Sequence, residues 1–168
     1  MNPNVRRIIV MVVALAAVFL LSRQRQTSSS GQPAPATPAP VSATFLNSEE
    51  SRNLNLPFSE AVRVGDLLFL SGQIGVQPGT MQLAPGGIEA EARQTMENIR
   101  ASLQRHGSSM DRVVKCTVFL TDMAEWPKFN EIYRTFFTGS FPARSALGAN
   151  GLAIGARVEV ECIALAGA

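Results

Sequence analysis

Residues 157–165 read RVEVECIAL, and this stretch decides the fold class. Successive side chains of a β-strand point to opposite faces, so the alternation predicts a strand with one face in an apolar core. The apolar face carries Val158, Val160, Cys162 and Ala164, and the opposite face carries Arg157, Glu159, Glu161 and Ile163. The second, charged face of such a sheet either meets water or packs against another subunit around a polar interior.

The segments on the N-terminal side supply a hairpin and a helix. SEAVRVGDLLFLSGQI (59–74) contains two alternating runs that turn at Gly65-Asp66, which predicts a β-hairpin. GIEAEARQTMENIRASLQRHG (87–107) has apolar residues every three or four positions, which predicts an amphipathic helix that ends at Gly107.

The segment between this helix and residue 157 supplies the remaining predicted elements, which are two strands and a second helix. DRVVKCTVFLTD (111–122) predicts a strand whose core face carries Val114, Cys116, Val118 and Leu120. Asp122 and Glu125 form a capping box for a second helix, with the apolar stripe Trp126, Phe129, Tyr133 and Phe136 or Phe137. Closing strands are expected at 144–148 and 156–165. The predicted order is ββαβαββ, an α+β sheet with both helices on one face.

The first part of the chain has a different composition. Residues 8–21 (IIVMVVALAAVFLL) are uncharged and follow Arg6 and Arg7, so we expect residues 1–21 to be a signal-anchor or a cleaved signal peptide. No clear cleavage site follows, which favours an anchor over a cleaved signal. Two arginines flank the segment on each side, so its charges barely set its orientation. We expect a bacterial inner-membrane anchor with the domain in the periplasm; the alternative is cleavage and secretion to the periplasm. Residues 22–43 are rich in Ser, Pro and Ala and are expected to form a disordered linker before a domain at 44–168.

Charge and cysteine content exclude two classes of function. From Thr44 onward there are 11 Lys or Arg against 13 Asp or Glu, which leaves no basic footprint for a nucleic-acid partner. The chain has two cysteines, no CxxC pair and one histidine, His106, so no metal site is expected. Cys116 and Cys162 could pair, although thiols inside strands are more often small core residues. His106 is expected at the surface, near a helix C-terminus.

The remaining question concerns PARSAL (142–147), which sets Arg144 among small and apolar residues. A guanidinium in such a place needs a partner. The spacing alone favours a structural ion pair with Glu159 or Glu161, and the alternative is a ligand carboxylate, whose two oxygens match the two-pronged donor set of arginine.

Several ordered motifs resemble one known family. They are PFSEAVRVGDLLFLSGQIG (57–75), QTMENIRASL (94–103), VVKCTVFLTDM (113–123), FNEIYRTFF (129–137), FPARSAL (141–147) and GARVEVECIA (155–164). Together they resemble the reactive intermediate/imine deaminases, the RidA or YjgF family. The resemblance implies a chorismate-mutase-like fold and a homotrimer with sites in clefts between subunits. It also implies hydrolysis of 2-aminoacrylate-type enamines and imines to 2-oxo acids and ammonia, with no cofactor.

The resemblance also implies roles for individual residues. Arg144 would hold the substrate carboxylate, and Glu159 would position or activate the hydrolytic water. Ser71 and Gly72 would lie against the substrate, where glycine allows close approach, and Asn130 would lie near the pocket. Glu161 is expected to be solvated or to form an interface ion pair.

Two positions depart from the family pattern. Phe58 replaces a pocket tyrosine and therefore lacks its hydroxyl group, which predicts an altered choice of substrate. Ala146 replaces a cysteine that can act through its backbone carbonyl, so alanine need not abolish activity. The runner-up function is therefore a non-catalytic trimer of this type that binds small 2-imino or 2-oxo acids.

Overall fold

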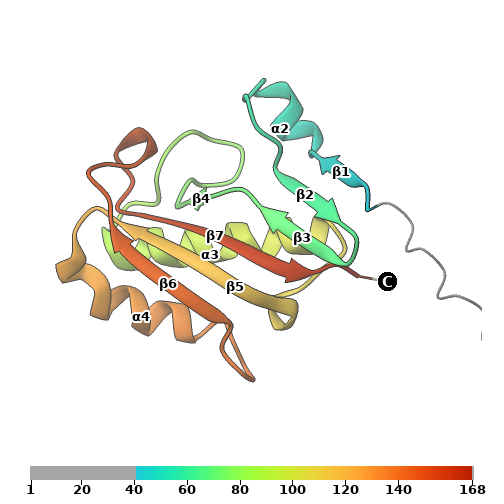
Figure 1. Ribbon diagram of the computed structural model, residues 1–168. Coiled ribbons are helices and arrows are strands. Elements are labelled where there is room, and N and C mark those ends of the chain that lie inside the picture. Colours follow the sequence, from blue (N-terminus) through green and yellow to red (C-terminus); the bar gives the residue numbers. More distant parts are fainter. Residues whose placement is uncertain (1–40, 168) are drawn as a thin grey trace, which may run out of the picture. The chain divides into compact units, whose positions relative to one another are not determined.

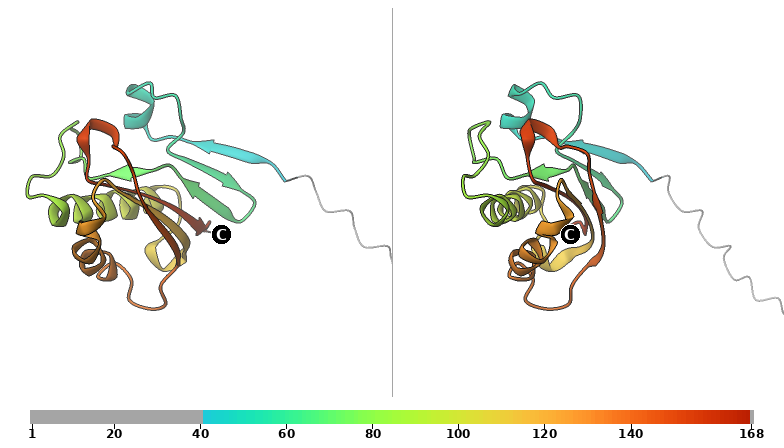
Figure 2. Two further views of the ribbon diagram at one scale, coloured as in Figure 1. Left: turned by 60° about the vertical axis from the view of Figure 1, so that its left-hand side comes forward. Right: turned by 90° about the vertical axis from the view of Figure 1, so that its left-hand side faces the viewer.

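The computed structural model describes residues 41–167, which form one mixed β-sheet with helices on one face (Figures 1 and 2). The strands are β1 (Ala43–Leu46), β2 (Ala61–Val64), β3 (Leu67–Leu70), β4 (Gln73–Ile74), β5 (Val113–Leu120), β6 (Ala143–Gly148) and β7 (Val158–Leu165). The helices are α2 (Glu49–Asn53), α3 (Ile88–Arg105) and α4 (Trp126–Arg134). The predicted α+β fold class, with α3 and α4 on one face, is confirmed.

The stretch 157–165 provides the central strand of the sheet. The strand order is β1-β2-β3-β7-β5-β6, and the short β4 pairs with the first half of β7. β5 and β6 run parallel, whereas the other neighbours are antiparallel. β7 therefore contacts strands from both halves of the domain, and its register against β5 and β3 determines which side chains share a face.

The core lies between this sheet and the two long helices. The apolar positions predicted for α3 are all buried: Ile88, Ala92, Met96, Ile99 and Leu103. They pack against the apolar face of β7 and β5, where Val118, Val158 and Val160 are fully buried. Each buried Val, Ile, Leu or Met side chain contributes about 1.5–3 kcal/mol relative to an exposed one. Gly107 has a φ of +76°, a left-handed conformation that favours glycine after a helix end.

The predicted hairpin at 59–74 is confirmed. β2 and β3 pair antiparallel from Ala61↔Leu70 to Val64↔Leu67, so the turn consists of Gly65 and Asp66. Gly65 has a φ of +57°, which two-residue hairpin turns require and which costs glycine little.

Two local predictions near β5 are wrong. The register of β5 against β7 shifts between Val113 and Lys115, and this irregularity buries Val113 and leaves Val114 40% exposed. Asp122 caps the 3-10 turn Met123–Glu125 rather than α4, by accepting a hydrogen bond from Ala124 N at 2.8 Å. Glu125 forms no capping box, because its carboxylate accepts from Arg157 Nη1 at 2.8 Å.

The side chain of His106 is only 7% exposed, so the prediction of a surface position is wrong. Its Nε2 lies 3.5 Å from a carboxylate oxygen of Glu60, which also contacts Arg105. Ser48 N, Ser51 Oγ and Ser102 Oγ donate to the same carboxylate, each at 3.1 Å. Burial raises the pKa of Glu60, but the hydrogen bonds from Ser48 and the charges of Arg105 and His106 outweigh it and hold the pKa below its usual value.

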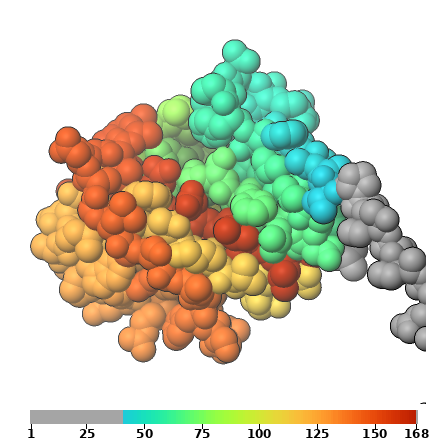
Figure 3. Space-filling view, in the orientation of Figure 1, coloured from blue at the N-terminus to red at the C-terminus, as the bar shows by residue number. Residues whose placement is uncertain are grey.

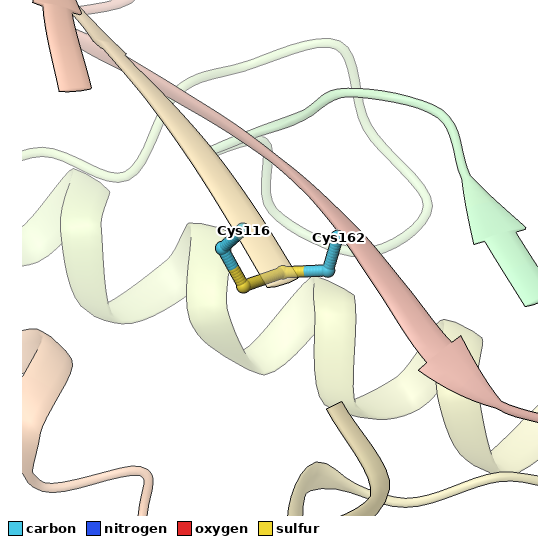
Figure 4. Close-up of a disulfide and its surroundings, with 2 residues drawn as sticks. All are labelled: Cys116 and Cys162. Atoms are coloured by element: carbon cyan, nitrogen blue, oxygen red, sulfur yellow. A yellow bond between two sulfur atoms is a disulfide. The ribbon is translucent and has the colours of Figure 1, made fainter. Parts of the chain in front are cut away.

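Cys116 and Cys162 form a disulfide between the two central strands (Figure 4). The two residues lie directly opposite each other in the β5–β7 register, with their Cα atoms 4.2 Å apart. Both side chains point into the core, as the alternation predicts. The expectation that free thiols are more common at such positions is wrong for this pair, because the register aligns the two cysteines.

The N-terminal predictions fall mostly outside the described residues. The segment at 1–21, and the linker at 22–43 as far as residue 40, lie there, so these boundaries stay predictions. The predicted location, a bacterial inner membrane with a periplasmic domain or secretion to the periplasm, is corrected. None of the helices within residues 41–167 has the length and apolar character needed to cross a membrane.

Candidate functional site

Glu159 and Gly72 lie together on the face of the sheet that the helices leave uncovered. In the space-filling view, strands β3, β7, β5 and β6 form much of the visible surface (Figure 3). The carboxylate of Glu159 occupies the place where a side chain at Gly72 would begin, since an ideal Cβ on Gly72 would lie 2.8 Å from Glu159 Cδ. Glycine leaves room for the carboxylate in this position, and a larger residue would displace it. Gly72 and Glu159, both predicted site residues, therefore lie in contact, and their roles stay predictions.

The electrostatic surroundings of Glu159 favour its protonated form. Burial raises the pKa of this carboxyl group, and the nearby charge of Glu161, two residues along the same face, raises it further. Glu161 itself is exposed. A carboxyl group with a raised pKa holds its proton to a higher pH than a free one, and such a group can take part in general acid–base chemistry.

Ser71 binds a neighbouring segment of its own chain, and its predicted place against the substrate stays a prediction. Its hydroxyl group donates a 2.6 Å hydrogen bond to the carbonyl oxygen of Ser59, and its backbone N donates to Glu60 O at 3.1 Å. These bonds tie the start of the glycine-containing loop to the segment that carries Phe58. Phe58 is 56% exposed, a large apolar side chain in contact with solvent. Ser71 thus holds the Phe58 segment in place in this chain.

Arg144 and Asn130 line a second feature, a cavity of about 410 Å³ beside β6. Its other lining residues are Tyr133, Arg134, Phe141 and Pro142. Within residues 41–167, Arg144 forms no ion pair with a carboxylate. The structural ion pair with Glu159 or Glu161, which the spacing alone favoured, is therefore absent from this part of the chain.

The partners of Arg144 within the chain are aromatic. Its guanidinium carbon lies 4.7 Å from the ring centroid of Trp126 and 4.5 Å from that of Tyr133. Such cation–π contacts stabilise a planar cation and hold it in one orientation. They leave the hydrogen-bond donors of the guanidinium available at the cavity.

Tyr133 adds a second unused donor to the cavity. Its hydroxyl oxygen is buried and has no hydrogen-bond partner among the described residues. Burial raises the pKa of Tyr133 to about 12, although the charge of Arg144 acts in the opposite direction. The hydroxyl group therefore stays protonated at neutral pH and can donate to an anion.

The register of the sheet separates the two groups of residues. Arg144 is paired with Cys116 across β5 and β6, so it shares the core face, where it reaches the α4 rings. Glu159 is paired with Phe119, one of the alternate residues on the opposite face. Ala146, paired with Val118, packs against the core on the Arg144 side. One chain therefore presents Gly72 and Glu159 on one face and Arg144 with Asn130 on the other.

Sequence reasoning missed the aromatic stack under Arg144. Trp126 and Tyr133 are seven positions apart on α4 and so share one helix face. This spacing by itself indicates core packing alone. The position of Arg144 over these rings depends on how β6 lies beside α4, which no local pattern contains.

Comparisons with known proteins agree with this architecture. Residues 51–166 match the family model described as Endoribonuclease L-PSP. A mouse 2-iminobutanoate/2-iminopropanoate deaminase is 45% identical over 111 residues, which cover 66% of this chain and 82% of the mouse protein.

Two solved structures are similar over the same region. RidA from an Antarctic Psychrobacter bacterium has a TM-score of 0.63 and 38% identity, and covers 66% of this chain and 89% of that one. TdcF from E. coli with bound serine has a TM-score of 0.62 and 34% identity, and covers 66% and 88%.

These likenesses bear on two predictions. The relatives carry the names of imine deaminases and RidA proteins, and none of these names supports the membrane location that is corrected above. The resemblance that the motifs indicated, by contrast, is confirmed over residues 51–166. The chain belongs to the RidA/YjgF family.

Proposed function

We propose that this protein hydrolyses reactive enamines and imines of the 2-aminoacrylate type to 2-oxo acids and ammonia. The observation that carries the proposal is the Arg144 guanidinium, which lines a cavity and has no carboxylate partner within residues 41–167. The name of the mouse relative, a 2-iminobutanoate/2-iminopropanoate deaminase, supports a 2-imino acid as the substrate class.

Arg144 would bind the substrate carboxylate. Its planar guanidinium group can donate two parallel hydrogen bonds to the two carboxylate oxygens, and charge-assisted hydrogen bonds of this kind are short and directional. The stack on Trp126 and Tyr133 reduces the motion of the guanidinium, so less freedom is lost on binding. Asn130 and the Tyr133 hydroxyl group line the same cavity and can donate further hydrogen bonds to the ligand.

Glu159 would act as the general base and then as the general acid of the hydrolysis. Water adds to C2 of the protonated imine while the carboxylate of Glu159 accepts a proton from that water. Glu159 then returns the proton to the nitrogen of the resulting carbinolamine. The C–N bond breaks, ammonia leaves, and the hydroxyl group gives its proton to the regenerated carboxylate as the 2-oxo acid forms. The raised pKa of Glu159 favours its protonated form and so its role as the proton donor in the second step.

The two groups would meet only between copies of the chain. Arg144 and Glu159 project from opposite faces of one sheet, so a single chain cannot place both against one substrate. The uncovered face carries the partly exposed apolar side chains Leu67, Phe69 and Leu147, which favours contact with another copy. We therefore propose a homotrimer with a site at each interface, in which Gly72, Glu159 and the Phe58 segment of one copy face Arg144 of the next.

The description of the family model names an endoribonuclease, and we do not extend that name to this chain. The domain has 11 Lys or Arg against 13 Asp or Glu from Thr44 onward. This balance offers no basic patch for a nucleic-acid backbone.

The test is ammonia release from imines that an amino-acid oxidase generates in the same vessel. We expect the purified full chain to accelerate the release, and light scattering to give the mass of a trimer. If the chain binds a 2-oxo acid but does not accelerate ammonia release, the result would refute the enzyme and support the runner-up function, a non-catalytic trimer that binds small acids. A monomer that hydrolyses imines would refute the shared site.

A further inference from the structure

The cavity beside β6 holds more positive charge than a monocarboxylate needs. Two of its six lining residues are arginines, Arg134 and Arg144, and none is acidic. The neutral polar groups are the amide of Asn130 and the buried, unpartnered hydroxyl group of Tyr133. Its volume of about 410 Å³ is within the range of small-molecule sites.

Arg134 is unusual among the arginines of this domain. Within residues 41–167, most arginine side chains contact a carboxylate or a backbone carbonyl oxygen: Arg52, Arg63, Arg100, Arg105, Arg112 and Arg157. The exceptions in this part of the chain are Arg93, Arg134 and Arg144, and two of these three line the same cavity. Two guanidinium groups that line one cavity can each bind one carboxylate of a ligand that has two such groups.

We propose that the cavity selects 2-imino and 2-oxo acids with a second acidic group, such as four- or five-carbon dicarboxylates. The C1 carboxylate binds Arg144, and the distal carboxylate binds Arg134 at the end of α4. The inference rests on the proposed function for the role of Arg144. It extends that function by assigning the substrate class, which the family likeness leaves open.

The competing role of Arg134 is purely structural. A cation in the last turn of α4 interacts favourably with the partial negative charge at the helix C-terminus. That role affects stability and makes no distinction between ligands with one and two negative charges. Selectivity for ligand charge therefore separates the two roles.

The experiment is isothermal titration calorimetry on the purified full chain. We compare 2-oxoglutarate with 2-oxobutanoate, and oxaloacetate with pyruvate. We expect the dicarboxylates to bind about tenfold more tightly, because a second charge-assisted contact forms. The preference is expected to shrink as salt rises, since the distal contact is solvent-exposed.

Two variants of Arg134 test whether its side chain causes the preference for dicarboxylates. Arg134→Gln is expected to reduce the ratio of dicarboxylate to monocarboxylate affinity to near one, and Arg134→Lys to restore part of it. The matched control is Lys128→Gln on the same helix, which lies outside the cavity and contacts Glu89 at 3.8 Å. This control removes the same net charge and is expected to keep the ratio.

The outcomes separate this inference from the proposed enzyme. A parent protein without the preference, an unchanged ratio in Arg134→Gln, or an equal loss in Lys128→Gln would each overturn the inference. Imine hydrolysis that proceeds without charge selectivity leaves the enzyme standing and refutes only the dicarboxylate class. Charge-selective binding without any hydrolysis supports the dicarboxylate class and refutes the enzyme.

Discussion

Arg144 and Glu159 point away from opposite faces of one β-sheet, on two strands that flank β5. Arg144 reaches two aromatic rings of α4, whereas Glu159 lies against Gly72 on the uncovered face. The two residues that the family likeness assigns to one reaction are thus separated by the thickness of the sheet. Any site that uses both needs a second copy of the chain.

The first prediction concerns Arg144→Lys. Lysine keeps the charge but loses both the two-pronged geometry and the flat stack on Trp126 and Tyr133. We expect imine turnover to fall about tenfold to hundredfold, almost as far as in Arg144→Ala, because hydrogen bonds to a charged group contribute about 1.5–3 kcal/mol. Arg100→Lys is the control, since Arg100 lies 5.6 Å from the Phe136 ring and outside the cavity. Turnover at the parent rate in a folded Arg144→Ala variant would show that this arginine binds no substrate.

A second prediction tests the close approach of Gly72 to Glu159. In Gly72→Ala, the added methyl group requires the place that the Glu159 carboxylate now occupies, so the carboxylate must move. We expect a loss of turnover of about a hundredfold, since small displacements of a catalytic group have effects of this size. Gly139→Ala is the matched control, because nothing lies within 4 Å of the position that its methyl group would take. Equal kinetics in the two variants would contradict the role of Glu159.

The third prediction concerns the pH dependence of turnover. Burial and the charge of Glu161 both raise the pKa of Glu159. Glu161→Gln removes the second contribution, so the limb of the pH–rate profile that belongs to Glu159 is expected to move to lower pH. Glu131→Gln on the exposed surface of α4 should leave the limb in place. A limb that does not move in Glu161→Gln would mean that another group controls the profile.

The raised pKa of Glu159 also has a consequence for stability. Its contribution is fully present below the unfolded-state pKa of about 4.5 and is lost as pH rises through the higher folded-state value. Replacing the ionisable group by Glu159→Gln is therefore expected to stabilise the fold at neutral pH relative to the parent. Urea unfolding of both proteins at pH 4 and pH 8 measures this difference, and a Glu159→Gln variant that is less stable at pH 8 would contradict it.

The fourth prediction concerns the disulfide between Cys116 and Cys162. The bond links residues 46 positions apart and restricts the unfolded chain accordingly. The loop-entropy model gives about 4 kcal/mol of stabilisation for a loop of this length. We expect a reductant to lower the urea midpoint of the parent, and the double variant Cys116→Ala, Cys162→Ala to show no further response to reductant. Identical midpoints of the parent with and without reductant would count against the bond.

The fifth prediction concerns the buried carboxylate of Glu60. Its pKa lies below the usual value, so its contribution to stability is present above pH 4.5 and is lost as pH falls through the folded-state value. Glu60→Gln is expected to cost about 2 kcal/mol at pH 7, because Arg105 and His106 lose their anionic partner. The exposed pair of Glu97 and Arg100 gives the control, since Glu97→Gln should cost less than about 1 kcal/mol. A difference between parent and Glu60→Gln that does not shrink as the pH falls below 4.5 would contradict the assignment.

The sequence by itself determined the elements and the faces of the core. The alternation in residues 157–165 and the spacing along residues 87–107 follow from local geometry, because side chains repeat every two residues in a strand and every 3.6 in a helix. For the same reason the turn at Gly65-Asp66 and the end of α3 before Gly107 were predictable. The motifs also led to the family, since they combine residue types whose order is specific even without coordinates.

Only the tertiary structure decided which side chains meet. The register shift at Val113 and Lys115 reverses the burial expected for Val114, and the alignment of β5 with β7 brings Cys116 opposite Cys162. The pairing of Arg144 with Cys116 turns this arginine toward Trp126 and Tyr133 rather than toward Glu159. Each of these outcomes depends on the offset between strands distant in sequence. A shift by a single residue would move every side chain to the other face, and no local pattern contains that offset.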